Sequence, residues 1–169
     1  YGASDCRPSA SGLDGPRGVA VGRDDSIYVA DAYHHRILRI DSFGTATRFA
    51  GTGERGLSGE RGPASEAQLD KPFAVATSDD GSVYIADSGN ARVRRVDENG
   101  IIETVVGQVG ALDMGAFATA KLHAPSAMAW SEALSSFFVA GGTSGRVFLA
   151  NLPTRTVSVV AGEPGGFED

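Results

Sequence analysis

Two aspartates recur at equivalent places in the chain, and their carboxylates are of a type that could carry chemistry. Asp31 and Asp87 each end a Tyr-Val/Ile-Ala-Asp run, 56 residues apart, and an arginine follows each five residues later, Arg36 and Arg92. A ring of such carboxylates could bind a metal ion or act as acid and base. Alternatively, each aspartate accepts backbone N–H bonds in its turn and pairs with the nearby arginine. We favour this structural role, because residues that recur in every repeat usually maintain the repeat.

The remaining candidates for chemistry are few. His34 and His35 are adjacent, so their side chains should point apart and could share a metal ion only with a distant third ligand. His123 stands in a Leu-His-Ala-Pro join, and the glycine-rich stretch 51–56 lacks the Gly-Lys-Ser/Thr ending of a phosphate loop. Cys6 is the single cysteine, which excludes a disulfide framework within the chain and leaves the redox compartment open. We therefore predict no catalytic residue, no metal ion and no cofactor.

The aspartates Asp31 and Asp87 and their arginines belong to a motif that appears three times. Leu13-Asp14-Gly15-Pro16 returns at 69–72 and 122–125, and the run at 28–31 returns at 84–87 and, with Gly141 in place of the aspartate, at 138–141. The third copy still has its arginine, Arg146. Self-similarity at this period indicates an array of one supersecondary unit. We predict a single segment over 1–169, with repeats at approximately 13–53, 69–107 and 122–162 joined by glycine-rich insertions at 54–68 and 108–121.

Each repeat has the composition of four short strands. In the first copy the β-prone runs are 19–21, 27–29, 37–40 and 47–50, separated by Gly, Asp and Ser turns. Asp-Gly and Asn-Gly pairs in the second copy favour tight hairpins, because these residues tolerate positive φ. Four antiparallel strands in a meander form one propeller blade. The predicted fold is therefore all-β, with β-propeller blades and helical turns only near 64–69 and 116–122.

Three stretches resemble NHL repeats: Gly15–Val21, Ile27–Asp31 and, as the best match, Asp87–Asp97. The long glycine-rich insertions resemble those of the bacterial and organellar type more than the compact RNA-binding animal group. The resemblance implies a six-bladed ring, of which this chain supplies three blades. The first copy departs from the pattern with His34 in place of Asn, and the third with Gly141, Ser144 and Leu149. The repeat positions expected to be structural are Asp31, Asp87, Asn90, Arg36, Arg92 and Arg146.

A propeller enzyme works at one mouth of the central channel, where the innermost strands meet. Those strands should be 18–21, 73–76 and 126–130, which contain no Asp, Glu, His or Asn. Calcium-dependent hydrolases and lyases built on related repeats need oxygen or imidazole ligands at this place. Such ligands would have to come from blades outside this chain.

Composition limits the class of partner. The chain has 15 basic and 21 acidic side chains and a net charge of −6, which disfavours nucleic acid, since a phosphate backbone needs a basic face. Arg92, Arg94 and Arg95 form only a local basic cluster. No apolar run approaches the roughly 20 residues of a transmembrane segment. Association with a membrane complex stays open.

We expect a non-catalytic protein–protein interaction or scaffold module that is a segment or subunit of a larger assembly. Three blades would expose unpaired apolar faces, so the expected partners are other protein chains or further blades of the same chain. One alternative is a propeller hydrolase or lyase whose active residues lie in blades outside this chain. A second alternative is an RNA-binding NHL domain, which the net charge disfavours.

Overall fold

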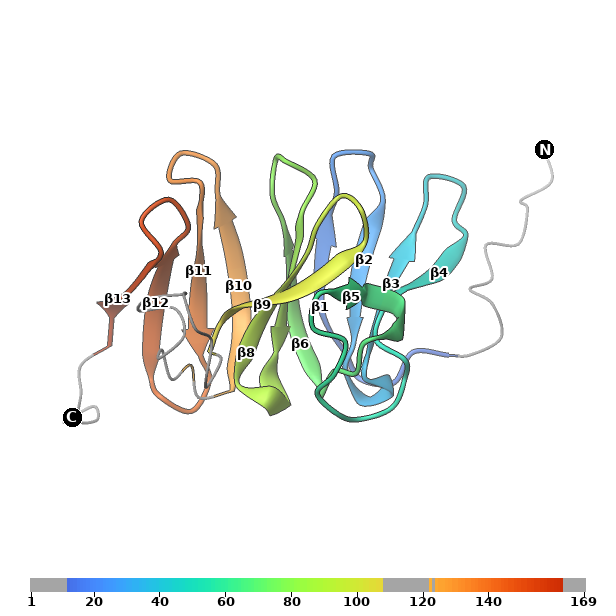
Figure 1. Ribbon diagram of the computed structural model, residues 1–169, viewed down its shortest axis with the longest axis horizontal. Coiled ribbons are helices and arrows are strands. Elements are labelled where there is room, and N and C mark those ends of the chain that lie inside the picture. Colours follow the sequence, from blue (N-terminus) through green and yellow to red (C-terminus); the bar gives the residue numbers. More distant parts are fainter. Residues whose placement is uncertain (1–11, 108–121, 123, 163–169) are drawn as a thin grey trace.

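The computed structural model describes residues 12–107, 122 and 124–162, which form three antiparallel sheets placed side by side (Figure 1). Each sheet is a four-stranded meander in chain order, and β5 (Gly62–Pro63) adds to the outer edge of the second. The strands are β1 (Pro16–Val21), β2 (Ile27–Asp31), β3 (Arg36–Ile40) and β4 (Ala46–Ala50) in blade 1, β6 (Pro72–Thr77), β7 (Val83–Asp87), β8 (Arg92–Val96) and β9 (Ile101–Val106) in blade 2, and β10 (Pro125–Ser131), β11 (Ser136–Gly141), β12 (Arg146–Asn151) and β13 (Thr156–Ala161) in blade 3. The predicted all-β fold is confirmed.

The outer hairpins of blades 1 and 2 form by the same local chemistry. Asp41 Oδ1 accepts the Thr45 amide at 2.8 Å, and Asp97 Oδ1 accepts the Ile101 amide at 2.9 Å. A glycine with positive φ closes each turn, Gly44 at 82° and Gly100 at 77°. These are Asx turns, in which a short acidic side chain replaces a backbone acceptor. The turn residues therefore fix the register of β3 with β4 and of β8 with β9.

Helical structure in the described residues is limited to three single turns, η1 (Ala32–His34), η2 (Ala64–Glu66) and η3 (Ser88–Asn90). η2 confirms the helical turn predicted near 64–69. None of these helices has the length and apolar character needed to span a bilayer. The turn predicted near 116–122, except for Leu122, and residues Cys6 and His123 lie outside the described residues.

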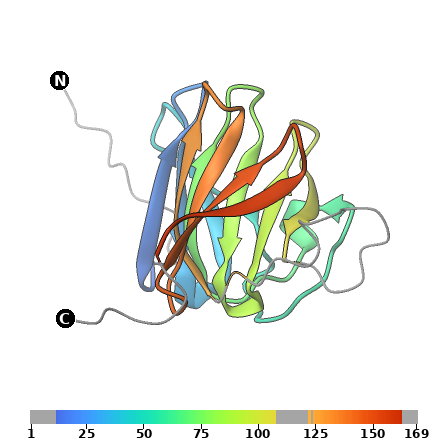
Figure 2. The same ribbon diagram turned by 90° about the vertical axis from the view of Figure 1, so that its left-hand side faces the viewer.

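Apolar cores lie between the blades. One joins Tyr28 and Ile37 of blade 1 to Ile85 of blade 2, and a second joins Tyr84 of blade 2 to Phe137 of blade 3. The first strands, β1, β6 and β10, run side by side with β6 in the middle, as predicted for innermost strands (Figure 1). The view along the stack shows β1 and β5 on opposite sides (Figure 2). The fold therefore carries its inner strands on one side and its outer strands and insertion on the other.

Candidate functional site

The inner strands were the predicted place for catalytic ligands. In the structure, β1, β6 and β10 bring together the segments 18–21, 73–76 and 126–130, whose side chains include no carboxylate or imidazole. Among the described residues, no group of three or more His, Cys, Asp or Glu side chains is placed to hold a metal ion. The polar groups with unusual environments lie elsewhere, at the ends of β2 and β7 and around the insertion.

Asp31 ends β2 with a fully buried side chain whose two oxygens have protein partners. Oδ1 accepts the Asp14 amide at 2.8 Å, and Oδ2 accepts Arg36 Nε at 2.8 Å. His34 Nδ1 lies 3.0 Å from Oδ2. This carboxylate therefore ties the start of the repeat to the turn after β2.

Asp87 occupies the equivalent place at the end of β7 with different partners. Its Oδ1 accepts the Asp70 amide at 2.7 Å, and its Oδ2 accepts Asn90 Nδ2 at 2.8 Å. Asn90 thus fills the place that His34 fills in blade 1, and it also donates to the Gly56 carbonyl at 2.8 Å. Burial raises the pKa of Asp87 to about 6, although these hydrogen bonds act in the opposite direction.

Arg92 is the cross-strand register partner of Asp87, but the guanidinium that approaches the Asp87 carboxylate is that of Arg94. Arg94 Nη1 lies 3.9 Å from Asp87 Oδ2, and both side chains are fully buried. Arg92 Nε is buried without a hydrogen-bond partner. In blade 1, Arg36 therefore binds the aspartate five residues before it. In blade 2, the ion pair of Asp87 is made with Arg94, seven residues after it.

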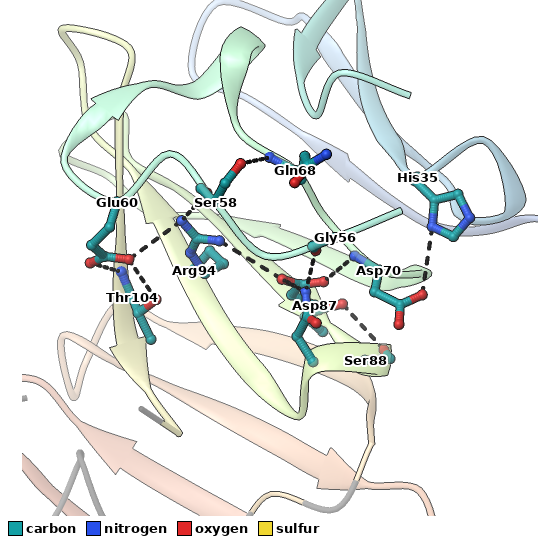
Figure 3. Close-up of polar contacts among 12 residues, drawn as sticks. His35, Gly56, Ser58, Glu60, Gln68, Asp70, Asp87, Ser88, Arg94 and Thr104 are labelled. Carbon is teal, nitrogen blue, oxygen red and sulfur yellow. Dashed lines mark hydrogen bonds and ion pairs between the residues drawn. The ribbon is translucent and has the colours of Figure 1, made fainter. Parts of the chain in front are cut away.

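Arg94 also holds the insertion against blade 2. Its Nη2 lies 3.4 Å from Glu60 Oε2 and 3.4 Å from the Ser58 carbonyl (Figure 3). The Glu60 carboxylate in turn accepts the Thr104 amide at 2.8 Å and the Thr104 hydroxyl at 2.9 Å. Burial lowers the pKa of Arg94, and the charges of Glu60 and Asp87 oppose that shift. Arg94 and Glu60 were missed from the sequence, because Leu38 stands at the place of Arg94 in blade 1.

A second polar cluster joins blade 1 to blade 2. The Lys71 amide donates to His35 Nδ1 at 3.1 Å, and the same nitrogen lies 3.6 Å from Asp70 Oδ1. Arg55 Nε donates to Asp70 Oδ2 at 2.9 Å. Burial lowers the pKa of His35. His34 and His35 thus serve different partners, and the arrangement is a junction between blades.

Blade 3 lacks this polar chemistry at the equivalent place. Gly141 stands where the other blades have their aspartate, and Arg146 pairs with it in the β11–β12 register. The Ser144 hydroxyl donates to the Gly141 carbonyl at 3.1 Å. The turn is therefore closed by a side chain-to-backbone hydrogen bond in place of an ion pair.

A groove runs beside the outer strand of blade 1. It has a volume of about 510 Å³, and Thr47, Arg48 and Phe49 of β4 form one wall. Segment 63–65 and the Asn99-Gly100 turn of blade 2 form the other. Tyr28 packs edge-on against Phe49 with ring centroids 4.8 Å apart, which gives the groove an aromatic floor. The groove combines apolar surface with the basic Arg48, the ion pair of Arg39 with Asp24, and polar groups.

The two ends of the blade stack expose apolar strands. Val19 and Val21 of β1 are 63% and 59% exposed, and Val159 and Val160 of β13 are 47% and 48% exposed. Isolated apolar side chains on a surface are ordinary, but pairs on one strand at each end of a stack form patches. These ends are therefore candidate contact surfaces.

Comparisons with known proteins agree with this architecture. The sequence model of the NHL repeat matches residues 13–40, and that of the teneurin NHL domain matches residues 44–121. The chain carries NHL repeats. The chloroplastic protein Suppressor of Quenching 1 of Arabidopsis thaliana is 34% identical over 88 residues, which cover 52% of this chain and 8% of that protein. Teneurin-1 of Mus musculus is 28% identical over 161 residues, which cover 83% of this chain and 6% of that protein. The NHL repeats described here thus span less than a tenth of these relatives.

Solved structures with the same fold include enzymes and binding proteins. A streptogramin B lyase matches with a TM-score of 0.63 at 11% identity, over 89% of this chain and 41% of the lyase. A gluconolactonase from Xanthomonas campestris matches with a TM-score of 0.62 at 12% identity, over 88% of this chain and 48% of that chain. A chain of a nidogen–laminin complex matches with a TM-score of 0.61 at 13% identity, over 88% of this chain and 49% of that chain. At these identities the likeness shows the β-propeller fold alone.

Proposed function

We propose that this NHL-repeat chain is a non-catalytic module that binds other polypeptides through its blade faces and edges, as a segment or subunit of a larger assembly. The observation that carries the proposal is the exposure of Val19 and Val21 at one end of the stack and of Val159 and Val160 at the other. Apolar strands left in water attract further strands or partner surfaces. The polypeptide that covers them belongs to further blades or to another chain.

The polar groups of the described residues support the same function. The Asp31 and Asp87 carboxylates accept backbone amides of the protein itself, and Arg94 lies beside Asp87, so these contacts support a role in stabilising the blades. A chain of a nidogen–laminin complex shares the fold, and the teneurins match by sequence. A rigid blade stack with these internal ties is suited to presenting edges and loops to a partner.

The alternative is a hydrolase or lyase, because the fold is shared with a streptogramin B lyase and a gluconolactonase. Such an enzyme would need its ligands from blades outside this chain, since β1, β6 and β10 supply none in the described residues. RNA binding is disfavoured by the net charge of −6.

Dye binding to the purified 169-residue chain tests the proposal. We expect strong fluorescence with an apolar dye and self-association in sedimentation velocity, both reduced in the double variant Val19→Glu, Val21→Glu. Phe43→Glu is the control, because Phe43 is 86% exposed at a hairpin tip and lies outside both valine pairs. A monomeric wild-type chain without dye binding would contradict the proposal, as would turnover of a lactone substrate by this chain.

A further inference from the structure

The outer strands of blades 1 and 2 have the same geometry. Ile40 pairs with Ala46 at the start of β4, and Val96 pairs with Ile102 at the same point of β9. Both strands follow the Asx turn described above, and equivalent residues differ by 56 in number. The backbone groups on their outer edges therefore correspond one to one.

In blade 2, the insertion covers this outer edge. β5 pairs antiparallel with the start of β9. The Arg61 amide donates to the Ile102 carbonyl at 2.7 Å, and the Ala64 amide donates to the Gly100 carbonyl at 2.8 Å. Further along β9, the Thr104 amide donates to the Glu60 carboxylate, as noted above. Gly62 and Pro63 thus pair with this edge as a short strand, and Arg61 beside them has a positive φ of 59°.

In blade 1, the corresponding edge groups are the carbonyls of Gly44 and Ala46 and the amide of Arg48. Within the described ranges, β4 pairs only with β3. The amide and carbonyl of one strand residue point to the same side, so the Ala46 amide faces away from β3 like its carbonyl. An edge of this kind is a template for an added strand.

The groove gives an added strand room for its side chains. It lies along β4 and has a volume of about 510 Å³, within the range of binding pockets. Tyr28 and Phe49 supply an aromatic surface for an apolar side chain. Such a strand would lie between β4 and the wall formed by segment 63–65.

Charge specifies the peptide further. Arg48 stands at the place of Thr104, because Leu38 pairs with Arg48 as Arg94 pairs with Thr104. In blade 2 the group that meets this place is the carboxylate of Glu60. The Arg48 side chain is exposed, and its Nη1 donates to the Thr52 carbonyl at 3.2 Å. A carboxylate brought by a peptide to its other N–H groups would gain a charge-assisted hydrogen bond.

We propose that β4 accepts an extended, carboxylate-bearing peptide of a partner protein as an added antiparallel strand, with the carboxylate beside Arg48 and an apolar side chain over Phe49. The inference rests on the proposed binding function and names the class of partner. It assigns the contact to backbone hydrogen bonds along 44–48 and to the adjoining groove.

Fluorescence anisotropy with a labelled peptide tests the inference on the full chain. The probe is Ser-Gly-Glu-Arg-Gly-Pro-Ala, the sequence of residues 58–64, and the control probe has Gln in place of Glu. We expect saturable binding of the probe and binding about tenfold weaker for the control probe, since a lost charge-assisted bond is worth about one decade in affinity.

Two protein variants locate the site. Ala46→Pro removes an outward amide without breaking the β3–β4 ladder and should weaken probe binding at least about tenfold. Arg48→Glu should weaken it similarly by charge repulsion, while Arg23→Glu, at an exposed turn residue, should leave it unchanged. Circular dichroism confirms that each variant is folded.

Three outcomes would overturn the inference. They are absence of probe binding to the wild-type chain, equal binding to folded Ala46→Pro, and binding only to a variant that begins at Gly12, which would assign the edge to the chain's own first residues. None of them changes the dye-binding result for Val19 and Val21, so a failure of this inference is distinct from a failure of the proposed function.

Discussion

Arg94 lies fully buried beside Asp87, with its Nη1 3.9 Å from the Oδ2 of that carboxylate. The opposite side of the same guanidinium faces Glu60 of the insertion. One buried cation therefore links the end of β7, the middle of β8 and a loop that begins more than thirty residues earlier. The insertion is fixed to blade 2 by this contact.

Replacing Arg94 with alanine should lower the free energy of unfolding by about 3–5 kcal/mol, because Asp87 and Glu60 would lose their buried counterion. Arg95→Ala is the matched control. Its side chain is 31% exposed beside Asp80 and Glu103, so its loss should cost about 1 kcal/mol or less. Urea denaturation of both variants measures the difference. Equal losses would show that Arg94 has no special role.

The stability of the protein should depend on the protonation of Asp87. Burial raises its pKa to about 6, so between pH 4 and 6 the folded state binds this proton more tightly than the unfolded state. The contribution of Asp87 to the free energy of unfolding therefore falls as pH rises through this window, by an amount on the order of 2 kcal/mol. Urea denaturation at pH 4 and pH 6.5 measures it.

Asp87→Asn isolates this dependence, since the variant has no proton to exchange at that position. Its stability relative to wild type should rise from pH 4 to pH 6.5. Asp97 provides the opposite case, because backbone hydrogen bonds hold its pKa below the usual range, and its contribution is lost only as pH falls below about 4. Parallel pH curves for wild type and Asp87→Asn would refute the raised pKa.

Glu60→Ala should loosen the insertion. The change leaves the buried Thr104 amide and hydroxyl without their acceptor, at a cost of about 1–3 kcal/mol. Trypsin should then cleave after Arg61 several times faster than in wild type. Glu66→Ala, at an exposed position of the same insertion, should not change the cleavage rate. Unchanged cleavage in Glu60→Ala would mean that other contacts hold the loop.

Gly18→Ala should separate blades 1 and 2. A Cβ atom at this position would lie 2.7 Å from the Ala74 Cα, so the inner strands β1 and β6 must move apart. Overpacking of this kind costs about 1–3 kcal/mol and should lower the melting temperature. Gly12→Ala is the control, because its Cβ would meet no atom within 4 Å. Identical melting curves for the two variants would argue against close packing of the inner strands.

Much of the fold could be predicted because its signals are local and repeated. Asp41-Ser-Phe-Gly44 and Asp97-Glu-Asn-Gly100 have the chemistry of tight turns, and the strands between such turns follow from alternation of β-prone runs. The recurrence of Asp31 with Arg36 pointed to a contact between the two side chains, whose Oδ2 and Nε atoms lie 2.8 Å apart. The residues that make these contacts lie within five positions of one another along the chain, so the residue types alone specify the contacts.

The polar contacts of blade 2 could not be predicted in the same way. Arg94 meets Glu60 only because the insertion folds back over β8, and the equivalent residue in blade 1 is Leu38, so the repeat pattern gives no signal for an arginine at this place. The groove beside β4 likewise forms from blade 1 and residues 63–65 and 99–100 of blade 2. Contacts of this kind depend on how the blades stack.

The central claim is that other polypeptide covers the end faces of this blade stack, and site-specific photo-crosslinking tests it most directly. A benzophenone amino acid replaces Val21 or Val159 in the protein expressed in its native cell. The control carries the same amino acid in place of Glu98, at an exposed hairpin tip. Mass spectrometry of the cross-linked peptides should show polypeptide joined at Val21 and at Val159, and little at Glu98. Cross-linking at the two valines no stronger than at Glu98 would contradict the claim.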